Sequence, residues 1–182
     1  LAGCAAAGLA LACAGGAPAP RGSAPPPAPL PDAPPPEEQS AQTLRAISAA
    51  GRLEGLRWPD FADYQPHFDA LYRTQEWRLL WIRDGKPTRQ AREVLTHLAM
   101  ADAAGLRPED YVAASLSKRF DAAGPKTSPA DLAKLDAALS VAAMRNVSDL
   151  HIGRVNPEHV GFQVDVGPKK LDLPQFVAEL AV

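Results

Sequence analysis

The chain has very few cysteines. Only Cys4 and Cys13 occur among 182 residues, and both lie in an apolar N-terminal stretch. After export processing, the globular part would hold no thiol, so neither a disulfide nor a cysteine-ligated metal could support it. The four histidines also lack H-E-x-x-H or another close metal-ligand spacing. We therefore expect no metal site and no cofactor.

Positive charge is neither abundant nor clustered. Nineteen Lys and Arg residues stand against 21 Asp and Glu residues, which gives a net charge of −2 and a pI near 6.1. Without a basic patch, nucleic-acid binding is a poor expectation. Asp63, Asp69 and Glu76 lie near aromatic residues, but no second carboxylate at a defined separation indicates glycoside hydrolysis. We expect these three on a solvated face.

Residues 1–16 are small and apolar, with the sequence LAGCAAAGLALACAGG. They lack an initiating Met and a basic leader, which indicates the remnant of an export signal. The stretch is shorter than the roughly 20 apolar residues of a transmembrane helix. Leu1-Ala2-Gly3-Cys4 resembles a lipobox, in which Cys4 would be lipidated. Cleavage before Cys13 in ordinary secretion, or a misassigned start site, would also account for the stretch.

Residues 17–39 form a linker rich in Pro and Ala, and most of the 19 prolines lie in it or close by. Proline fixes backbone angles and donates no hydrogen bond, which favours an extended, semi-rigid spacer. The segment is therefore predicted to be disordered, either as a tether or simply as an uncommitted connection between signal and domain.

Residues 40–182 are predicted to form one mainly α-helical domain with a few short strands. Ser40–Ala50 has apolar residues at helical spacing. A turn at Trp58-Pro59 precedes a helix over 60–72, in which Pro66 is either a first-turn residue or a kink. The apolar run 77–82 ends at Asp84-Gly85, which predicts a buried strand or extended segment and a tight turn.

A helix should follow from Thr88, because apolar residues recur there at helical spacing: Ala91, Val94, Leu95, Leu98 and Ala101. Gly105 should end it, with Leu106 folding back as in a Schellman-type cap. Pro108 begins a new helical turn, and Tyr111 should dock its ring.

Ser128 and Asp131, with Pro129 at the first position, predict the start of a long central core helix. Its apolar stripe runs down to Gly153 and comprises Leu132, Leu135, Leu139, Ala142, Ala143, Val147 and Leu150. A turn at Asn156-Pro157 and an alternating segment around 162–166 should follow. The ending predicts a helix from Pro174 that continues past Val182.

Three motifs in this domain carry a family resemblance: an aromatic pair before a W…DG turn, GLRPEDY, and LDAALSVAAMRNVSDLHIGRVNPE. Over 53–182 the chain resembles the N-terminal scaffold region of the large murein L,D-transpeptidases. The matching positions are Trp81, Gly105, Leu106, Arg107, Pro108, Tyr111, Asp136, Gly153, Arg154 and Pro157. Asn146 departs from the pattern, because the family tends to place an aromatic residue there.

The resemblance implies a periplasmic or cell-envelope location and a role in peptidoglycan crosslinking between two diaminopimelate residues. None of the matching positions is catalytic in the family, whose cysteine lies in a separate domain downstream. Its signature, Ser or Thr followed by His-Gly-Cys, is absent here, and acyl transfer needs a thiolate, a base and oxyanion donors. We expect this chain to be inactive alone. Its implied partners are the downstream catalytic and peptidoglycan-binding domains and peptidoglycan itself.

Other interpretations remain open. The chain could be a stand-alone, lipid-anchored module that binds peptidoglycan or another envelope protein, or an enzyme acting through His151 and His159. His151 should lie in the last turn of the long helix, where a cation favours the helix dipole. Trp58, Trp77 and Trp81 fit a core or a sugar-stacking platform, with the core favoured. Arg154 fits an internal salt bridge or a bound carboxylate.

Overall fold

The computed structural model describes residues 34–153 and 171–182. In this part of the chain the α-helices are α1 (Pro36–Ala50), α2 (Gln65–Thr74), α3 (Arg89–Ala99), α4 (Ala113–Ala122), α5 (Pro129–His151) and α6 (Leu173–Leu180). The shorter elements are the 3-10 turns η1 (Ala62–Tyr64), η2 (Ala101–Ala104) and η3 (Pro108–Tyr111), and the strands β1 (Ile82–Arg83) and β2 (Lys86–Pro87). The predicted mainly α-helical fold is confirmed. None of the helices described is long and apolar enough to cross a bilayer.

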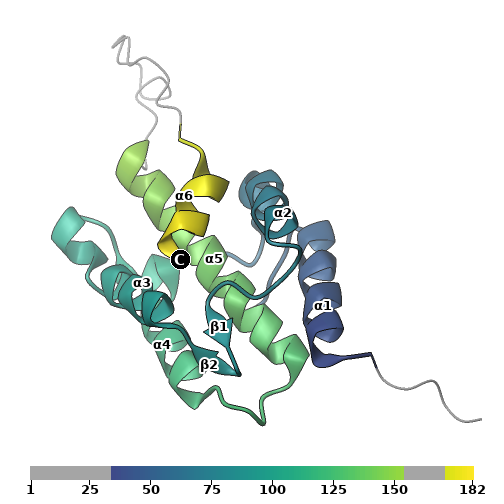
Figure 1. Cartoon of the computed structure of the whole chain (residues 1–182). Coiled ribbons are helices and arrows are strands. Elements are labelled where there is room, and N and C mark those ends of the chain that lie inside the picture. Colours follow the sequence, from purple (N-terminus) through teal and green to yellow (C-terminus); the bar gives the residue numbers. More distant parts are fainter. Residues whose placement is uncertain (1–33, 154–170) are drawn as a thin grey trace, which may run out of the picture. The chain divides into compact units, whose positions relative to one another are not determined.

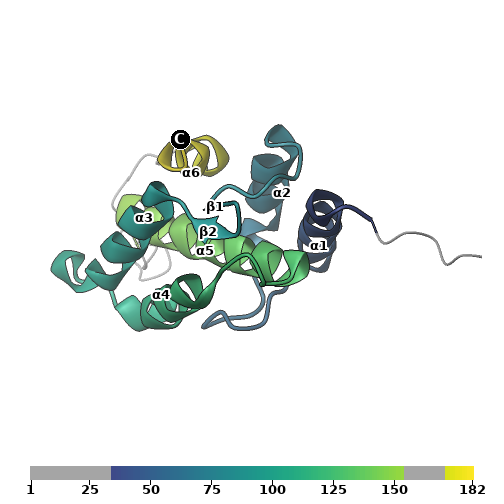
Figure 2. The same cartoon turned by 60° about the horizontal axis from the view of Figure 1, so that its bottom comes forward.

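Helix α5 lies at the centre of this domain. In both views it runs between α1 and α2 on one side and α3 and α4 on the other, while α6 packs against α2 and α5 (Figures 1 and 2). Every residue from 135 to 146 is buried. A surface helix buries only one stripe, whereas burial all round marks a helix inside the core. The predicted central core helix is confirmed, and Ser128 caps it by accepting the Asp131 N–H at 3.1 Å.

Helix α1 begins at Pro36, before the boundary at residue 40 that composition indicated. Proline suits the first helical turn, where its missing N–H leaves no bond unmade, and Glu37 and Glu38 place negative charge at the positive end of the helix dipole. The Ser40 hydroxyl also donates to the Pro129 carbonyl oxygen at 3.1 Å. This bond ties the start of α1 to the start of α5.

Helix α2 begins at Gln65, later than predicted, because the chain first makes the 3-10 turn η1. The Asp60 carboxylate accepts the Ala62 N–H at 2.9 Å and holds the chain in a turn there. Pro66 lies in the first turn of α2, so it is a first-turn residue and not a kink. Phe68 of this helix packs on Tyr72 with ring centroids 4.6 Å apart.

The run 77–82 was predicted as a buried strand or an extended segment, and only its last residue, Ile82, lies in a strand, β1. It pairs antiparallel with β2 through Asp84 and Gly85, whose φ angles of 52° and 72° suit a tight hairpin turn. Leu80 and Trp81 are buried, but their N–H groups bind the side chain of Asp136 rather than a strand. A carboxylate thus takes the place of a neighbouring strand.

Gly105 forms the predicted Schellman-type cap, with φ 74° and a hydrogen bond of 3.1 Å from the Leu106 N–H to the Ala101 carbonyl oxygen. The cap closes η2 instead of α3, which already ends at Ala99. Pro108 begins a 3-10 turn of four residues rather than a longer helix. Helix α4 follows it, which the sequence analysis did not predict, although its buried residues Ala113, Leu116 and Phe120 are apolar.

Several predictions lie outside the described residues: the signal and linker segments with Cys4 and Cys13, the positions Arg154 and Pro157, and the alternating segment around 162–166. These stay predictions. A C-terminal helix does form, with Asp172 accepting the Gln175 N–H at 3.0 Å, but the prediction that it continues past Val182 is wrong, because α6 runs from Leu173 to Leu180.

Candidate functional site

The carboxylate of Asp136 is the polar centre of the core, and it is completely buried. Its Oδ1 accepts the Tyr72 hydroxyl at 2.7 Å and the Leu80 N–H at 3.1 Å, and its Oδ2 accepts the Trp81 N–H at 2.8 Å. One side chain on α5 therefore holds α2 and the segment leading into the hairpin.

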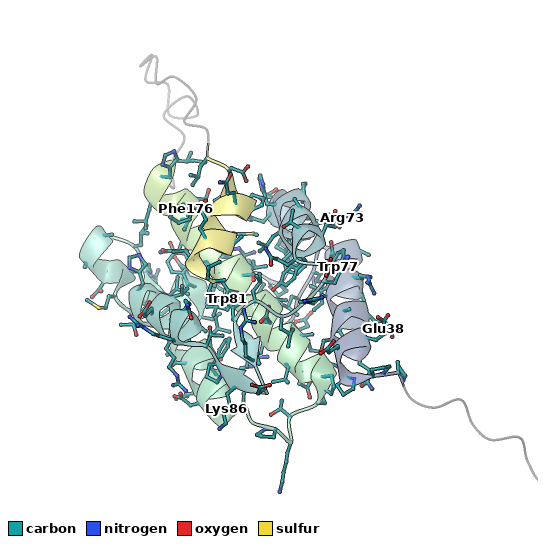
Figure 3. All side chains as sticks on the ribbon, viewed as in Figure 1. Glu38, Arg73, Trp77, Trp81, Lys86 and Phe176 are labelled. Atoms are coloured by element: carbon teal, nitrogen blue, oxygen red, sulfur yellow. The ribbon has the colours of Figure 1, made fainter. Side chains whose placement is uncertain are left out.

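Ser140 completes this arrangement one helical turn later. Its hydroxyl oxygen lies 2.8 Å from the Tyr72 hydroxyl oxygen and accepts the Trp81 indole N–H at 2.9 Å. We call Tyr72, Trp81, Asp136 and Ser140 the Asp136 network. Figure 3 shows Trp81 among the helices, whereas Glu38, Arg73 and Lys86 lie on the outer rim of the same view.

The structure thus brings together two of the predicted motif residues, Trp81 and Asp136. Sequence reasoning missed Tyr72 and Ser140 as their partners. A signal was available for Ser140, which follows Asp136 by four residues and therefore shares its helix face. Both interrupt an otherwise apolar stretch of α5, and buried polar side chains need partners.

Burial raises the pKa of Asp136 to about 6, against the opposing effect of the hydrogen bonds that it accepts. Burial and the nearby Asp136 charge also raise the pKa of Tyr72 well above its ordinary value. A carboxyl group with a raised pKa can serve as an acid or base. Asp136 is fully buried, however, and its oxygens are occupied by the core, so the arrangement has a structural role.

The remaining motif residues in the described part of the chain lie in turns and in the core. Gly105, Leu106 and Pro108 shape the connection between α3 and α4. Tyr111 is 1% exposed, as predicted, and its hydroxyl donates to Asp149 at 2.6 Å. Gly153 follows α5 with a φ of 94°, a conformation that L side chains rarely adopt.

The three tryptophans differ in how deeply they are buried. Trp81 is buried as predicted, and Trp77 is half-buried with its ring stacked 6.4 Å from that of Tyr72. The core prediction is wrong for Trp58, which is 45% exposed. The guanidinium of Arg145 lies 5.7 Å from the Trp58 ring and donates to the carbonyl oxygens of Trp58 and Asp60 at 2.9 and 2.8 Å. Burial lowers the pKa of Arg145.

The three acidic residues near these aromatics also differ in exposure to solvent. Asp63 and Glu76 are exposed as predicted. Asp69 is half-buried, and its carboxylate accepts the Ser48 hydroxyl at 3.1 Å. This bond joins α2 to α1, so Asp69 has a structural partner rather than a place on a fully solvated face.

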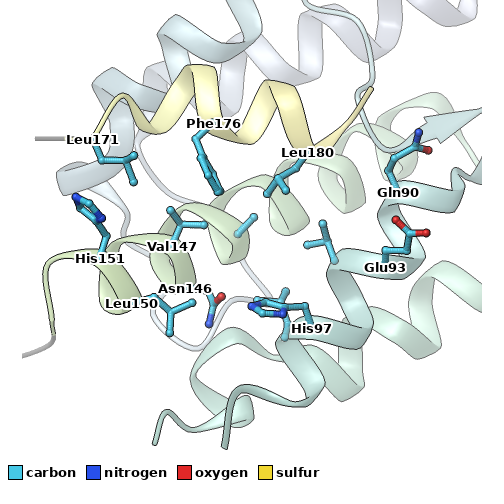
Figure 4. Close-up of a pocket in the computed structure, with 13 residues that line it drawn as sticks. Gln90, Glu93, His97, Asn146, Val147, Leu150, His151, Leu171, Phe176 and Leu180 are labelled. Atoms are coloured by element: carbon cyan, nitrogen blue, oxygen red, sulfur yellow. The ribbon is translucent and has the colours of Figure 1, made fainter. Parts of the chain in front are cut away.

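A cavity of about 550 Å³ opens between α3, α5 and α6. We call it the α3–α5–α6 groove. Figure 4 shows it, and its lining residues are Gln90, Glu93, Val94, His97, Leu98, Ala143, Asn146, Val147, Leu150, His151, Leu171, Phe176 and Leu180. Asn146 is 2% exposed, and its Nδ2 has no hydrogen-bond partner.

Histidines occur at two places in this groove. His151 is the last residue of α5, as predicted, and His97 lies near the end of α3. Within residues 34–153 and 171–182, no group of three His, Cys, Asp or Glu side chains could hold a metal ion. The lining residues make the groove an apolar cavity with a polar rim.

Comparisons with known proteins bear on the domain as a whole. A family model described as Scaffold domain matches residues 66–182. Comparisons with curated proteins and with solved structures each find no match. The family match includes the whole Asp136 network and the turn at Gly105 and Pro108. Since it covers more than half of the chain, this chain belongs to the Scaffold domain family.

Proposed function

We propose that this chain is the non-catalytic scaffold part of an exported murein L,D-transpeptidase that crosslinks peptidoglycan in the cell envelope. The observation that carries the proposal is the match to the Scaffold domain family over residues 66–182. Within the match lie the W…DG turn and the GLRPEDY motif on which the resemblance to those enzymes rests. The catalytic and peptidoglycan-binding parts would follow this domain in the same protein.

The contacts inside the domain support a role in holding other parts in place. The Asp136 network fixes the segment before the hairpin to the central helix. Ser40 and Asp69 connect the first helices to α5 and to each other. A domain whose elements are joined by buried hydrogen bonds is rigid, and rigid support keeps a neighbouring site in productive geometry.

The coding DNA downstream of Val182 gives the first test. An in-frame continuation that encodes Ser or Thr followed by His-Gly-Cys is the expected result. A stop codon directly after Val182 would overturn the proposal. It would favour a stand-alone envelope module, which a pull-down on purified peptidoglycan sacculi would then detect.

A second test measures crosslinking by the full-length protein. With tetrapeptide-bearing muropeptides as substrate, mass spectrometry should find dimers joined through two diaminopimelate residues, and the 182-residue chain alone should form none. In the full-length protein, Asp136→Asn should lower dimer formation, because it disturbs the Asp136 network. Asp121→Asn, at an exposed position on α4, is the matched control and should leave dimer formation unchanged. Dimer formation by the 182-residue chain would contradict a non-catalytic role.

A further inference from the structure

We propose that the α3–α5–α6 groove binds a small amphiphile, whose apolar body fills the groove and whose carbonyl or carboxylate oxygen accepts a hydrogen bond from Asn146. The ligand chemistry is thus a short acyl chain with an oxygen acceptor. This site is separate from the Asp136 network and does not depend on the scaffold role proposed above.

The size and walls of the groove fit such a ligand. Its volume of about 550 Å³ lies within the range of roughly 300–1,000 Å³ that small-molecule pockets occupy. The apolar walls come from all three helices: Val94 and Leu98 on α3, Val147 and Leu150 on α5, Phe176 and Leu180 on α6. The groove is therefore lined by separate elements of the fold rather than by a single helix face.

Two of these walls remain in contact with solvent. Leu150 is 46% exposed and Phe176 is 38% exposed, although both belong to the lining of one cavity. A single exposed apolar side chain is ordinary, but exposed apolar side chains that converge on a cavity indicate a surface that gains stability when it is covered. An acyl chain would cover both at once.

Asn146 supplies the second, independent observation. Its side chain is 2% exposed and lines the groove, and its Nδ2 has no hydrogen-bond partner. Buried polar groups nearly always have a partner, and an amide nitrogen can only donate. The missing partner must be an acceptor, so the ligand needs an oxygen atom.

The polar rim shows where the oxygen-bearing end would lie. Figure 4 places His97 beside Asn146, while Glu93 and Gln90 lie along the α3 side of the groove and His151 lies at the end of α5. The acceptor oxygen would therefore lie between Asn146 and His97. The apolar body would extend towards Phe176 and Leu180.

The test is a titration of the ¹⁵N-labelled 182-residue chain, followed by NMR at probe concentrations below micelle formation. The probes are decanoate, methyl decanoate and decylamine. The two oxygen-bearing probes should bind and shift the side-chain amide resonances of Asn146. Decylamine is protonated at neutral pH and brings no acceptor, so it should bind at least roughly fivefold more weakly, as expected for one lost hydrogen bond.

The two oxygen-bearing probes distinguish the source of the ligand. Tighter binding of decanoate assigns the site to a free carboxylate. Equal or tighter binding of methyl decanoate assigns it to an esterified acyl chain. Failure of both probes to bind would overturn the proposal, and so would binding of decylamine with the same affinity as the other two.

Two variants separate the hydrogen bond from the apolar wall. Asn146→Leu keeps the side-chain size and removes the donor, so decanoate should bind about fivefold more weakly. Leu150→Gln alters a half-exposed wall and should weaken binding on the order of tenfold. Ile152→Gln is the matched control, because Ile152 is 53% exposed at the same helix end and does not line the groove.

The affinities of these variants decide between the possible outcomes. Unchanged affinity in Asn146→Leu would contradict the role of the amide. An equal loss in Leu150→Gln and Ile152→Gln would mean that binding is non-specific. If Asn146→Leu does not fold, the Leu150 and Ile152 pair and the amide resonances of Asn146 in the unaltered chain still decide the question.

Discussion

Buried polar side chains towards the two ends of helix α5 differ in whether they have hydrogen-bond partners. Towards its N-terminus, Asp136 and Ser140 are completely buried, and each has hydrogen-bond partners from other segments. Towards its C-terminus, Asn146 is almost as deeply buried, yet its amide nitrogen has no partner. The same helix therefore contains one completed polar network and one incomplete site.

The burial of apolar residues also differs between the two ends of α5. The helix is buried all round from 135 to 146, but its stripe then reaches Val147 and Leu150, which line an open groove. The completed end is expected to stabilise the fold. The incomplete end costs stability in the free protein, and natural proteins keep such features mainly where another molecule binds. The following predictions test this difference.

The largest effect should come from Asp136→Ala. The substitution leaves the buried N–H groups of Leu80 and Trp81 without their acceptor, and each orphaned group costs about 1–3 kcal/mol. We expect the free energy of unfolding to fall by about 4 kcal/mol, measured by urea denaturation. Asp121→Ala is the control, because Asp121 is exposed on α4 and makes one surface ion pair, with Arg92, so its loss should cost about 1 kcal/mol or less. A loss in Asp136→Ala no larger than in the control would refute the structural role of the network.

The second prediction concerns pH. The pKa of Asp136 is about 6 in the folded chain and near its ordinary value of 3.8 in the unfolded chain, so the folded state binds the proton more tightly. The resulting stability is complete below pH 3.8 and is lost as pH rises through about 6. Each pH unit between the two values is worth about 1.4 kcal/mol, which gives about 3 kcal/mol in all.

Urea denaturation at several pH values measures this contribution. In the unaltered chain, the free energy of unfolding should rise as pH falls from 7 towards 4. Asp136→Asn should lack that part of the rise. The lowered pKa of Asp131 acts in the opposite direction but only at still lower pH, because its stabilising effect is lost when its carboxylate is protonated. An identical pH dependence in the two proteins would contradict the prediction.

A smaller loss is expected for Tyr72→Phe. The ring stays in the core, where it packs 4.6 Å from Phe68, but Asp136 and Ser140 both lose the hydroxyl. Thermal and urea denaturation should show a loss of about 2 kcal/mol. Tyr64→Phe is the matched control, since Tyr64 is only partly buried against the core. Equal losses would mean that the hydroxyl of Tyr72 has no special role.

The smallest effect, and the one of opposite sign, should come from Asn146→Leu. Replacing an unpartnered buried amide by an apolar side chain of similar size removes a desolvation cost without removing a hydrogen bond of Nδ2. We expect the free energy of unfolding to rise by about 1 kcal/mol. Ser140→Ala is the counterpart at the completed end and should lower it. A loss in both variants would break the comparison between the two ends of α5.

Sequence reasoning located the elements best where local chemistry decides them. Ser128 caps its helix as expected, and the helix expected from Thr88 forms with Thr88 as its N-cap, because a capping bond forms between neighbours in the sequence. The Gly105 cap was also predicted, because a left-handed residue is a local requirement. Helix α4 was missed because its N-cap residue, Val112, has a left-handed backbone conformation, and no glycine or proline at that position indicates a helix start.

The candidate sites were predicted less completely. Trp81 and Asp136 were singled out through the family resemblance, but nothing in the sequence indicated that the carboxylate would receive the backbone N–H groups of Leu80 and Trp81. That contact joins positions 55 and 56 residues apart. The groove could not be predicted for the same reason, because α3, α5 and α6 line it from distant parts of the chain.

The sequence by itself determined that this chain forms a mainly helical domain with a long central helix, because helical spacing, caps and turn residues act over a few positions. It also carried the motifs on which the family resemblance rests. Only the tertiary structure decided which polar residues of that helix are satisfied and which are left incomplete. The physical reason is that a hydrogen bond depends on the distance between two atoms in space. The packing of other helices therefore decides that Asp136 has partners and that the Nδ2 of Asn146 has none.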